Sequence, residues 1–492
     1  MLEIDMSRFK SYEPRQGMFF EFYPDAHFTQ GSYEHFLVNT LEQIDISCFW
    51  NKEDQGGERP YDPRSMLGII FYAISLGIFR SRQIEKACKD NFGFMYVGGH
   101  AKPDHTTICR FITNHHEAIV KIFMIILYLA HEQGYIDYEK IAIDGTKIKA
   151  NASKKFSGRM ADFEKRKSKL EEKIENALKK LETATDEDER NYWKKKKERY
   201  ESDKKKISDF LKEAQKEFNN RGKERIQNIT DPDSRMMKMG KEFKQAYNAQ
   251  AGVCGKNGFI VGADVVTDEN DRNQFSNMVG QVKAAKSEKA RASANKEKYL
   301  CDNGYVSKES LEYMKENDIE AYIPVTADKH AYEDTVKKKK ALRVEECDVW
   351  EEEGYVKLKC PGERIFKRKK SRKDQKVYTF TAGIVSNCEG CKHFGKCRGK
   401  LKGIDKKFEV TSQYLKTADL LKKHIEKMKT DNARRIYSRR IDIVEKVFGQ
   451  IKECLNIRKM LRRSIEKVKT EWMFIVCAYN MKKLHKVSVQ AN

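Results

Sequence analysis

The sequence predicts a mixed α/β core that follows a helical N-terminal domain and is interrupted by two insertions. Short apolar runs typical of buried strands recur between residues 139 and 325, whereas residues 1–135 and the stretch after 405 show helical spacing. A long, highly charged segment with a narrow apolar seam separates the first strand from the others. We expect six segments: a helical domain (1–135), the first part of the core (136–155), a charged helical hairpin (156–235), the rest of the core (236–330), a basic, β-rich, cysteine-containing insertion (331–404) and C-terminal helices (405–492).

The composition favours a polyanionic partner. Lys and Arg exceed Asp and Glu by 97 − 74 = 23 among 492 residues, and the basic residues also cluster locally. A surplus of this size is typical of proteins that bind nucleic acid. The alternative is that a lysine-rich surface serves solubility only.

Nothing in the sequence indicates a membrane partner. Residues 1–15 carry charges throughout and lack the apolar segment of a signal peptide. The longest apolar runs, 66–79 and 122–130, are shorter than the roughly 20 residues that span a bilayer. The twelve cysteines therefore indicate reduced thiols or metal ligands in an intracellular chain.

Residues 1–135 are expected to form a set of helices. Residues 66–74 are apolar nearly all round, which predicts a buried helix, with Asp62 as its cap and Pro63 at its first position. Further helices are expected after Ser81 and after residues 103–107, with a glycine-rich turn at 97–100 between them. This order resembles a DNA-binding helical module, and a plain packing domain fits equally well.

The charged segment 156–235 is expected to form an antiparallel helical hairpin. Its apolar residues fall at alternating three- and four-residue steps, and an acidic stretch at 185–189 separates the two runs. Charge of this kind is usually a solvated helix face, so direct contact with DNA is the less favoured interpretation.

The remaining core shows strand patterns. Residues 245–254 and 259–267 look like a hairpin around Asn257-Gly258, a strong turn signal. A strand at 299–302, a helix at 307–317 and a strand at 321–325 follow. Strands are also expected at 349–360 and 376–382, and helical chain from Tyr414 to the end.

Three acidic residues stand out against this pattern. Asp144 ends an apolar strand pattern, Asp302 follows another, and Glu445 lies on an amphipathic helix. Two divalent ions held by carboxylates activate the attacking oxygen and stabilise the leaving oxygen in phosphoryl transfer. Mg²⁺ prefers oxygen ligands, and three acidic side chains can hold two ions if one side chain bridges. The sequence therefore points to phosphoryl transfer on nucleic acid.

Each of these residues also has a structural interpretation. Asp144 could be a turn cap, Asp302 in Asp-x-Gly could form an Asx turn, and Glu445 could belong to a solvated helix face. Asp264 is a rival for the second position because it also emerges from an apolar strand.

Basic residues surround the glutamate. Lys452 lies two helical turns after Glu445, where it can contact a phosphate, and Gly449 lets a phosphodiester approach the helix. Tyr437, Arg439 and Arg440 precede the glutamate and are further candidates for DNA contact.

Four motifs together carry a resemblance to a known family. They are the Ala-Ile-Asp-Gly-Thr-Lys strand at 142–147, Tyr-Asn-Ala-Gln at 247–250, Asp-x-Gly-Tyr at 302–305 and Val-Glu-x-x-Phe-Gly-x-x-Lys at 444–452. In these the chain resembles bacterial insertion-sequence transposases of the DDE class over nearly its whole length. The spacing from Arg440 to Glu445 is one residue longer than in the family's commoner signature.

The resemblance implies a ribonuclease-H-like core with a mixed five-stranded sheet and helices. It implies that Asp144, Asp302 and Glu445 bind two Mg²⁺ (or Mn²⁺) ions. Such an enzyme cleaves the terminal inverted repeats of a DNA element and joins the 3′-OH ends to target DNA. The expected setting is a homodimer on double-stranded DNA in the bacterial cytoplasm, associated with the nucleoid, with the helical N-terminal domain in DNA binding or dimerisation.

Four cysteines form a candidate structural zinc site. Cys388-x2-Cys391 is a knuckle pattern, and Cys397 and Cys360 can complete four thiolate ligands. The alternatives are reduced surface thiols or replacement of one ligand by His393. The remaining cysteines lie mostly in apolar runs and are expected in the core.

Two other functions share this pattern. A catalytically inactive, transposase-derived DNA-binding protein would keep the basic surfaces. A nuclease with the same core would cut DNA without joining it. Metal-dependent nicking at element ends separates the first of these from the enzyme, and joined products separate the second.

Overall fold

The structure is a computed structural model, and ten stretches of it are described. They are residues 28–49, 60–218, 222–292, 296–325, 344, 347–369, 377–381, 388, 390–398 and 407–491. The predictions that concern residues 1–27 lie outside the described residues.

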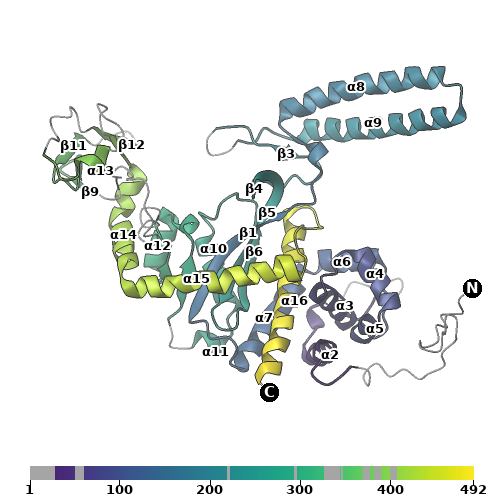
Figure 1. The fold of residues 1–492 in the computed structure, drawn as a ribbon, viewed down its shortest axis with the longest axis horizontal. Helices are drawn as coiled ribbons and strands as arrows, with labels where there is room; N and C mark the ends of the chain where they lie inside the picture. The colour runs from purple at the N-terminus through teal and green to yellow at the C-terminus, as the bar shows by residue number, and fades with distance from the viewer. Residues whose placement is uncertain are drawn as a thin grey trace, which may run out of the picture.

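The N-terminal part is helical, as predicted. Asp62 caps the buried helix through the N–H of Arg64, and Pro63 occupies its first turn. The helices pack against one another and, through α3 and α7, against the C-terminal helix α16 (Figure 1). Their bounds are α2 (Tyr33–Gln43), η2 (Ser47–Phe49), α3 (Pro63–Ser75), α4 (Ser81–Asp90), α5 (Phe92–Val97), α6 (His105–Asn114), α7 (His116–Glu132) and α16 (Ile465–Ala491).

One mixed sheet forms the centre of the molecule. Its strands are β1 (Lys140–Lys149), β4 (Arg235–Met239), β5 (Glu242–Cys254), β6 (Ile260–Val266), β7 (Lys298–Cys301) and β8 (Glu320–Tyr322). Strand β5 is antiparallel to β1, β4 and β6, whereas β7 is parallel to both β1 and β8. The order across the sheet is therefore β6 or β4, then β5, β1, β7 and β8.

The sheet has six strands where five were expected. Strand β5 is 13 residues long, and its outer edge pairs first with β4 and then with β6. The hairpin of β5 and β6 turns at Asn257 and Gly258, which both have positive φ, as the Asn-Gly signal predicts.

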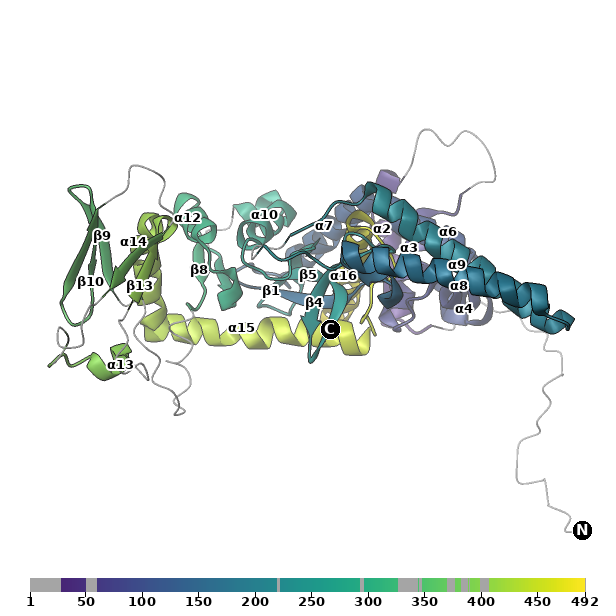
Figure 2. The ribbon, with the colours of Figure 1, turned by 90° about the horizontal axis from the view of Figure 1, so that it is seen from above.

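Helices cover both faces of this sheet. Helix α15 (Asp431–Gly449) crosses one face and contacts β1, β5, β7 and β8 (Figure 1). Figure 2 shows α15 beneath the strands and α10 (Phe275–Ala285) above them. Short elements complete the core: α11 (Glu288–Arg291), η4 (Asn303–Tyr305) and α12 (Lys308–Glu316). One continuous set of apolar side chains joins the sheet, these helices and the N-terminal helices.

The predicted hairpin is confirmed as two long helices, α8 (Met160–Thr183) and α9 (Glu187–Glu213). It extends away from the sheet (Figure 1) and has a small apolar cluster of its own, which includes Phe163 and Ile207. At its base lie η3 (Lys154–Phe156) and the paired strands β2 (Ser157–Gly158) and β3 (Gln227–Asn228).

The cysteine-containing insertion is β-rich, as expected, but one of its strands was predicted wrongly. The single strand expected at 349–360 is a hairpin, because Glu353 and Gly354 turn the chain with positive φ. The bounds are β9 (Asp348–Glu352), β10 (Tyr355–Lys359), β11 (Ile365–Lys369), β12 (Val377–Thr381), α13 (Phe394–Arg398) and β13 (Lys407–Thr411).

Among the described residues after Tyr414 the chain is helical, as predicted, except at Thr430 and at residues 455–464. Helices α14 (Ser412–Lys429) and α15 are followed by a π-helical turn, η7 (Gln450–Cys454), and then by irregular chain up to α16. Asn456 and Ser464 have positive φ in this irregular segment. Among the described residues, no helix is both long and apolar enough to cross a membrane.

Candidate active site

Asp144 and Asp302 lie side by side at the centre of the sheet. Strands β1 and β7 are parallel, and Ile143 pairs with Cys301. The next residues along the two strands are the two aspartates, and neighbouring strands lie about 4.8 Å apart. Strand β1 continues to Lys149, so Asp144 lies within the strand and not at its end.

A buried arginine from α15 neutralises Asp144. The Nη2 atom of Arg440 lies 2.7 Å from Oδ2 of Asp144, and only 9% of the arginine side chain is exposed. The pKa of Arg440 is raised: its burial works against the charge, but Asp144, Tyr437 and Asp302 favour it. We predicted that Arg440 contacts DNA, but in the structure its guanidinium group is paired with the carboxylate of Asp144.

The surroundings of Asp144 work against its negative charge. Burial raises the pKa of Asp144 to about 6, Arg440 lowers it, and the charges of Asp302 and Asp271 raise it again. A carboxylate in this position gains from a second cation, because like charges nearby are otherwise uncompensated.

Asp302 also makes the turn that its sequence suggested. Its Oδ1 accepts a hydrogen bond from the N–H of Gly304 at 2.7 Å and caps the short helix η4. Tyr305 is buried, and its hydroxyl donates to Oε1 of Gln250. The Asx turn thus fixes the exit of the chain beside the site and leaves Asp302 next to Asp144.

Asp271 was not predicted and belongs to the same neighbourhood. Its Oδ1 accepts hydrogen bonds from Nδ2 of Asn248 at 2.7 Å and from Nε2 of Gln250 at 2.6 Å. A Cβ on Gly145 would meet the same atoms, with Asp271 Oδ1 at 2.5 Å, so the glycine makes room for this network. The Tyr-Asn-Ala-Gln motif was the available signal, since two of its side chains hold Asp271.

Asp264 occupies a different environment. Lys469 lies 2.9 Å from its Oδ1, and Nδ2 of Asn277 donates to its Oδ2 at 2.7 Å. Asp264 lines a small cavity with residues of α7, α10 and α16, and Arg440 is not among the lining residues. The structure therefore pairs Asp144 with Asp302 and not with Asp264.

Glu445 lies on α15, and its side chain is exposed. Its position is five residues after Arg440, which turns it away from the buried face that contacts Asp144. The ion pair that α15 makes with Asp144 comes from Arg440 and not from Glu445. The role of Glu445 as third ligand stays a prediction.

Lys452 lies in the π-helical turn η7 and is half-buried. Burial lowers its pKa, and the attraction of Asp144 opposes this shift, which places Lys452 within electrostatic reach of the aspartate. Single π-helical turns are rare in proteins, and those that occur are often found at functional sites.

A basic groove begins beside the aspartates. Gly145, Thr146 and Lys452 line one side of a cavity of about 660 Å³. Six of its lining side chains are cationic: Lys147, Lys149, Lys238, Lys244, Lys452 and Arg458. Glu453 is its one acidic lining residue among those described, and Arg458 pairs with it.

The other predicted DNA contacts of α15 differ in exposure. Burial raises the pKa of Tyr437 to about 12, and Arg440, Asp302 and Asp144 also act on it, so Tyr437 belongs to the carboxylate neighbourhood. Arg439 is exposed and lines a different pocket on the neighbouring flank of α15.

The structure gives the zinc prediction no support. Cys360, Cys388, Cys391 and Cys397 are all described, and none of them forms a disulfide. Two of them, Cys360 and Cys391, approach the same residue, Gly362. Within the described residues, no group of three or more His, Cys, Asp or Glu side chains is gathered closely enough to hold a metal ion.

The carboxylate pair nevertheless suits a divalent cation. Asp144 and Asp302 offer only oxygen donors from adjacent strands, which is the ligand type that Mg²⁺ prefers. Asp144 is half-buried beside like charges and relies on Arg440 for compensation. Two of the three predicted ligands are thus together, with Glu445 on the helix that crosses them.

These features define a basic α/β protein with paired carboxylates at the centre of its sheet. Residues 359–485 match the family model described as Transposase DDE domain, and residues 28–114 match the model described as Transposase domain (DUF772). The two matches support the resemblance to insertion-sequence DDE transposases. Neither curated proteins nor solved structures gave a match. The DDE match contains Glu445 and Lys452, whereas both aspartates lie outside the matched segments.

Proposed function

We propose that this chain is an active DDE transposase that cleaves DNA at element ends and joins the 3′-OH to target DNA. The observation that carries the proposal is the register of β1 and β7, which sets Asp144 beside Asp302. The basic groove that starts at Gly145 gives a nucleic-acid backbone access to the same place.

The sheet supports a ribonuclease-H-like core for this enzyme. Strands β6, β5 and β1 are antiparallel neighbours, and β7 and β8 continue the sheet in parallel with β1. Counted along the chain without β4, β1 is the first strand of this sheet and β7 the fourth. Asp144 lies in β1, and Asp302 directly follows β7. Strand β4 and the two insertions are additions to this arrangement.

Asp144, Asp302 and Glu445 would hold divalent metal, Mg²⁺ or Mn²⁺. When bound, two such ions activate the attacking oxygen and stabilise the leaving oxygen of an in-line displacement. Arg440 keeps Asp144 ionised and in place before the metal arrives, because their ion pair offsets the cost of burying the carboxylate. Asn248 and Gln250 fix Asp271, whose charge adds to the attraction for a cation.

The cations of the groove would position the DNA. Lys452 lines the groove and would contact a phosphate next to the scissile one, and Lys147 and Lys149 lie on the strand that carries Asp144. The N-terminal helices, which match the second transposase model, would contribute to end binding or to dimerisation. A homodimer would bring two element ends together.

The test is strand cleavage and joining by the purified protein on DNA that carries the inverted repeats flanking the reading frame. The wild type is expected to nick the ends and form joined products only with Mg²⁺ or Mn²⁺. Asp144→Asn and Asp302→Asn are expected to lose at least a thousandfold in rate while binding the same DNA. Normal cleavage by either variant would refute the assignment, and binding without cleavage by the wild type would indicate an inactive relative.

A further inference from the structure

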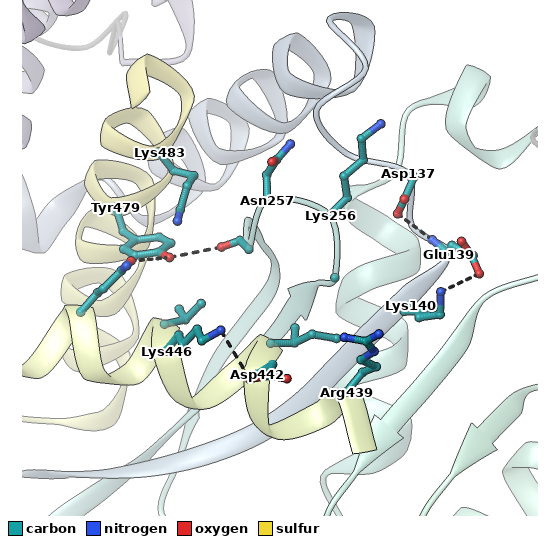
Figure 3. A pocket seen from close by; sticks show the side chains of 15 residues that line it. Asp137, Glu139, Lys140, Lys256, Asn257, Arg439, Asp442, Lys446, Tyr479 and Lys483 are labelled. Carbon is teal, nitrogen blue, oxygen red and sulfur yellow. Dashed lines mark hydrogen bonds and ion pairs between the residues drawn. The ribbon is translucent and has the colours of Figure 1, made fainter. Parts of the chain in front are cut away.

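A second basic pocket lies beside α15. Its volume is about 630 Å³, and it is formed by α15, the turn between β5 and β6, the start of β1 and α16 (Figure 3). Five of its side chains are cationic: Lys140, Lys256, Arg439, Lys446 and Lys483. Three are acidic: Asp137, Glu139 and Asp442.

Two of the five cations have acidic partners within the pocket. Lys140 lies 2.9 Å from Glu139, and Lys446 lies 3.4 Å from Asp442. Asp137 accepts a hydrogen bond from the N–H of Glu139 at 3.0 Å. The acidic groups of the pocket are thus already engaged.

The other three cations have no such partner. Among the described residues, no carboxylate lies within ion-pair distance of Lys256, Arg439 or Lys483. Lys483 is partly buried against the Tyr479 ring, 5.6 Å from its centroid, and burial together with Lys486 lowers the pKa of this lysine. Three cations from three separate elements therefore line one pocket without a carboxylate partner among the described residues (Figure 3).

The pocket continues along α16. A neighbouring cavity of about 200 Å³ shares Gln450, Tyr479 and Lys483 with it and adds Lys482 and Lys486. The positive charge thus forms a strip from the β5–β6 turn to the far part of α16. A strip of cations fits the spaced phosphates of a nucleic-acid strand better than a single small anion.

The pocket is separate from the carboxylates. Lys140 precedes Asp144 by four residues of β1, roughly 13 Å at the rise of an extended strand. On α15, Arg439, Asp442 and Lys446 share one stripe, while Arg440 points to Asp144. DNA held here would not be the strand that enters the groove at Gly145.

We propose that the pocket of Lys256, Arg439 and Lys483 binds backbone phosphates of DNA outside the groove that leads to Asp144. The inference rests on the proposed function, since it supposes DNA as the ligand. It assigns the pocket to affinity and placement of a further DNA segment, with no part in the chemical step.

The test compares a double variant, Lys256→Ala/Lys483→Ala, with a matched control, Lys315→Ala/Lys423→Ala. The control removes two exposed lysines of α12 and α14 that line neither basic pocket. Binding to a long duplex is measured from 50 to 300 mM salt. The slope of log K against log salt falls by about 0.9 for each phosphate that the protein no longer neutralises. The pocket variant should therefore lose about 2 in slope and roughly tenfold in affinity, and the control neither.

A footprint on the wild type keeps the test valid if the double variant folds poorly. Lysine acetylation with and without duplex should show Lys256 and Lys483 protected and Lys315 and Lys423 unprotected. Equal slopes for the two variants, or no protection of Lys256 and Lys483, would overturn the proposal. A third outcome is that inorganic phosphate stabilises the wild type thermally but not the pocket variant, while both show the same salt slope for DNA binding. That outcome would assign a small-anion site and would also overturn the proposal.

Cleavage assays separate this proposal from the proposed function. At saturating DNA, the pocket variant should cut at the wild-type rate. If the pocket variant loses slope but the wild type shows no metal-dependent cleavage, the proposed enzyme activity is refuted and the proposal for the DNA pocket stands.

Discussion

At the scale of single residues, the ion pair between Arg440 and Asp144 is the most informative contact. It joins α15 to β1 at 2.7 Å in a largely buried place. Removing one partner of a buried ion pair leaves an uncompensated charge, which typically costs about 3 kcal/mol or more, whereas removing both costs less.

Arg440→Gln should therefore lower the thermal unfolding midpoint of the metal-free protein. Asp144→Asn/Arg440→Gln should recover most of that loss, because no buried charge is left alone. Differential scanning fluorimetry of the two variants and of Asp144→Asn provides the measurement. Additive losses in the double variant would show that the pair is not coupled.

The pKa of Asp144, about 6, predicts the pH dependence of metal binding. Since the ordinary value is 3.8, the folded protein binds the proton more tightly than the unfolded chain does. The stability that Asp144 contributes is thus present below pH 3.8 and is lost as the pH rises to about 6. The affinity for metal changes with pH in the opposite direction and increases as the pH rises, because metal binding requires the ionised carboxylate of Asp144.

Mg²⁺ affinity should be constant above about pH 6 and fall roughly tenfold per pH unit below it. Titration calorimetry between pH 5 and 8 measures this. An affinity that does not change between pH 5 and 7 would contradict Asp144 as a ligand with a raised pKa.

At the scale of elements, Glu471 fixes the irregular segment between η7 and α16. It is fully buried, and its carboxylate oxygens accept hydrogen bonds from the N–H groups of Leu461 and Arg462 at 3.0 and 3.1 Å. The same segment is hydrogen-bonded to the sheet, because the N–H of Met460 donates to the carbonyl of Lys149 on β1. Burial raises the pKa of Glu471 to about 7.

The raised pKa of Glu471 determines how its contribution to stability changes with pH. The ordinary value is 4.5, so its contribution to stability is greatest below pH 4.5 and is lost as the pH rises to about 7. Glu471→Gln imitates the protonated form. The difference in unfolding midpoint, variant minus wild type, should increase between pH 4.5 and 7 and level off above it. A difference that is independent of pH would refute the raised pKa.

The sequence was sufficient for the elements whose patterns are local. A few neighbouring residues were enough to predict three features: the Asn257-Gly258 turn, the Asp62 cap, and the apolar strands around Asp144 and Asp302. The break after η7 could not be predicted in this way, because residues 455–464 keep a helical composition and their path is fixed by Glu471 and β1. Asp271 was missed for the same kind of reason, since its partners Asn248 and Gln250 lie on another strand.

At the scale of the whole molecule, part of the excess of 23 positive charges lies in two pockets, one beside α15 and the other beside β1 and η7. Neither pocket is lined by Asp144 or Asp302. Affinity for DNA and catalysis should therefore be separable functions of this chain.

Asp302→Asn should accordingly bind duplex DNA at least as tightly as the wild type without metal, because it removes a negative charge near the groove. Fluorescence anisotropy with labelled duplex in EDTA measures this. A tenfold loss of affinity would show that the aspartate is needed for folding or for DNA contact, and that binding and catalysis are not separable at this residue.

The most direct measurement of the central claim replaces Mg²⁺ by Fe²⁺ and cuts the protein backbone with locally generated hydroxyl radicals. Ions held by Asp144, Asp302 and Glu445 should give fragments that end near these three positions, and excess Mg²⁺ should suppress them. Cuts near 144 and 302 without cuts near 445 would remove Glu445 from the site. No cuts near Asp144 and Asp302 would contradict the whole account.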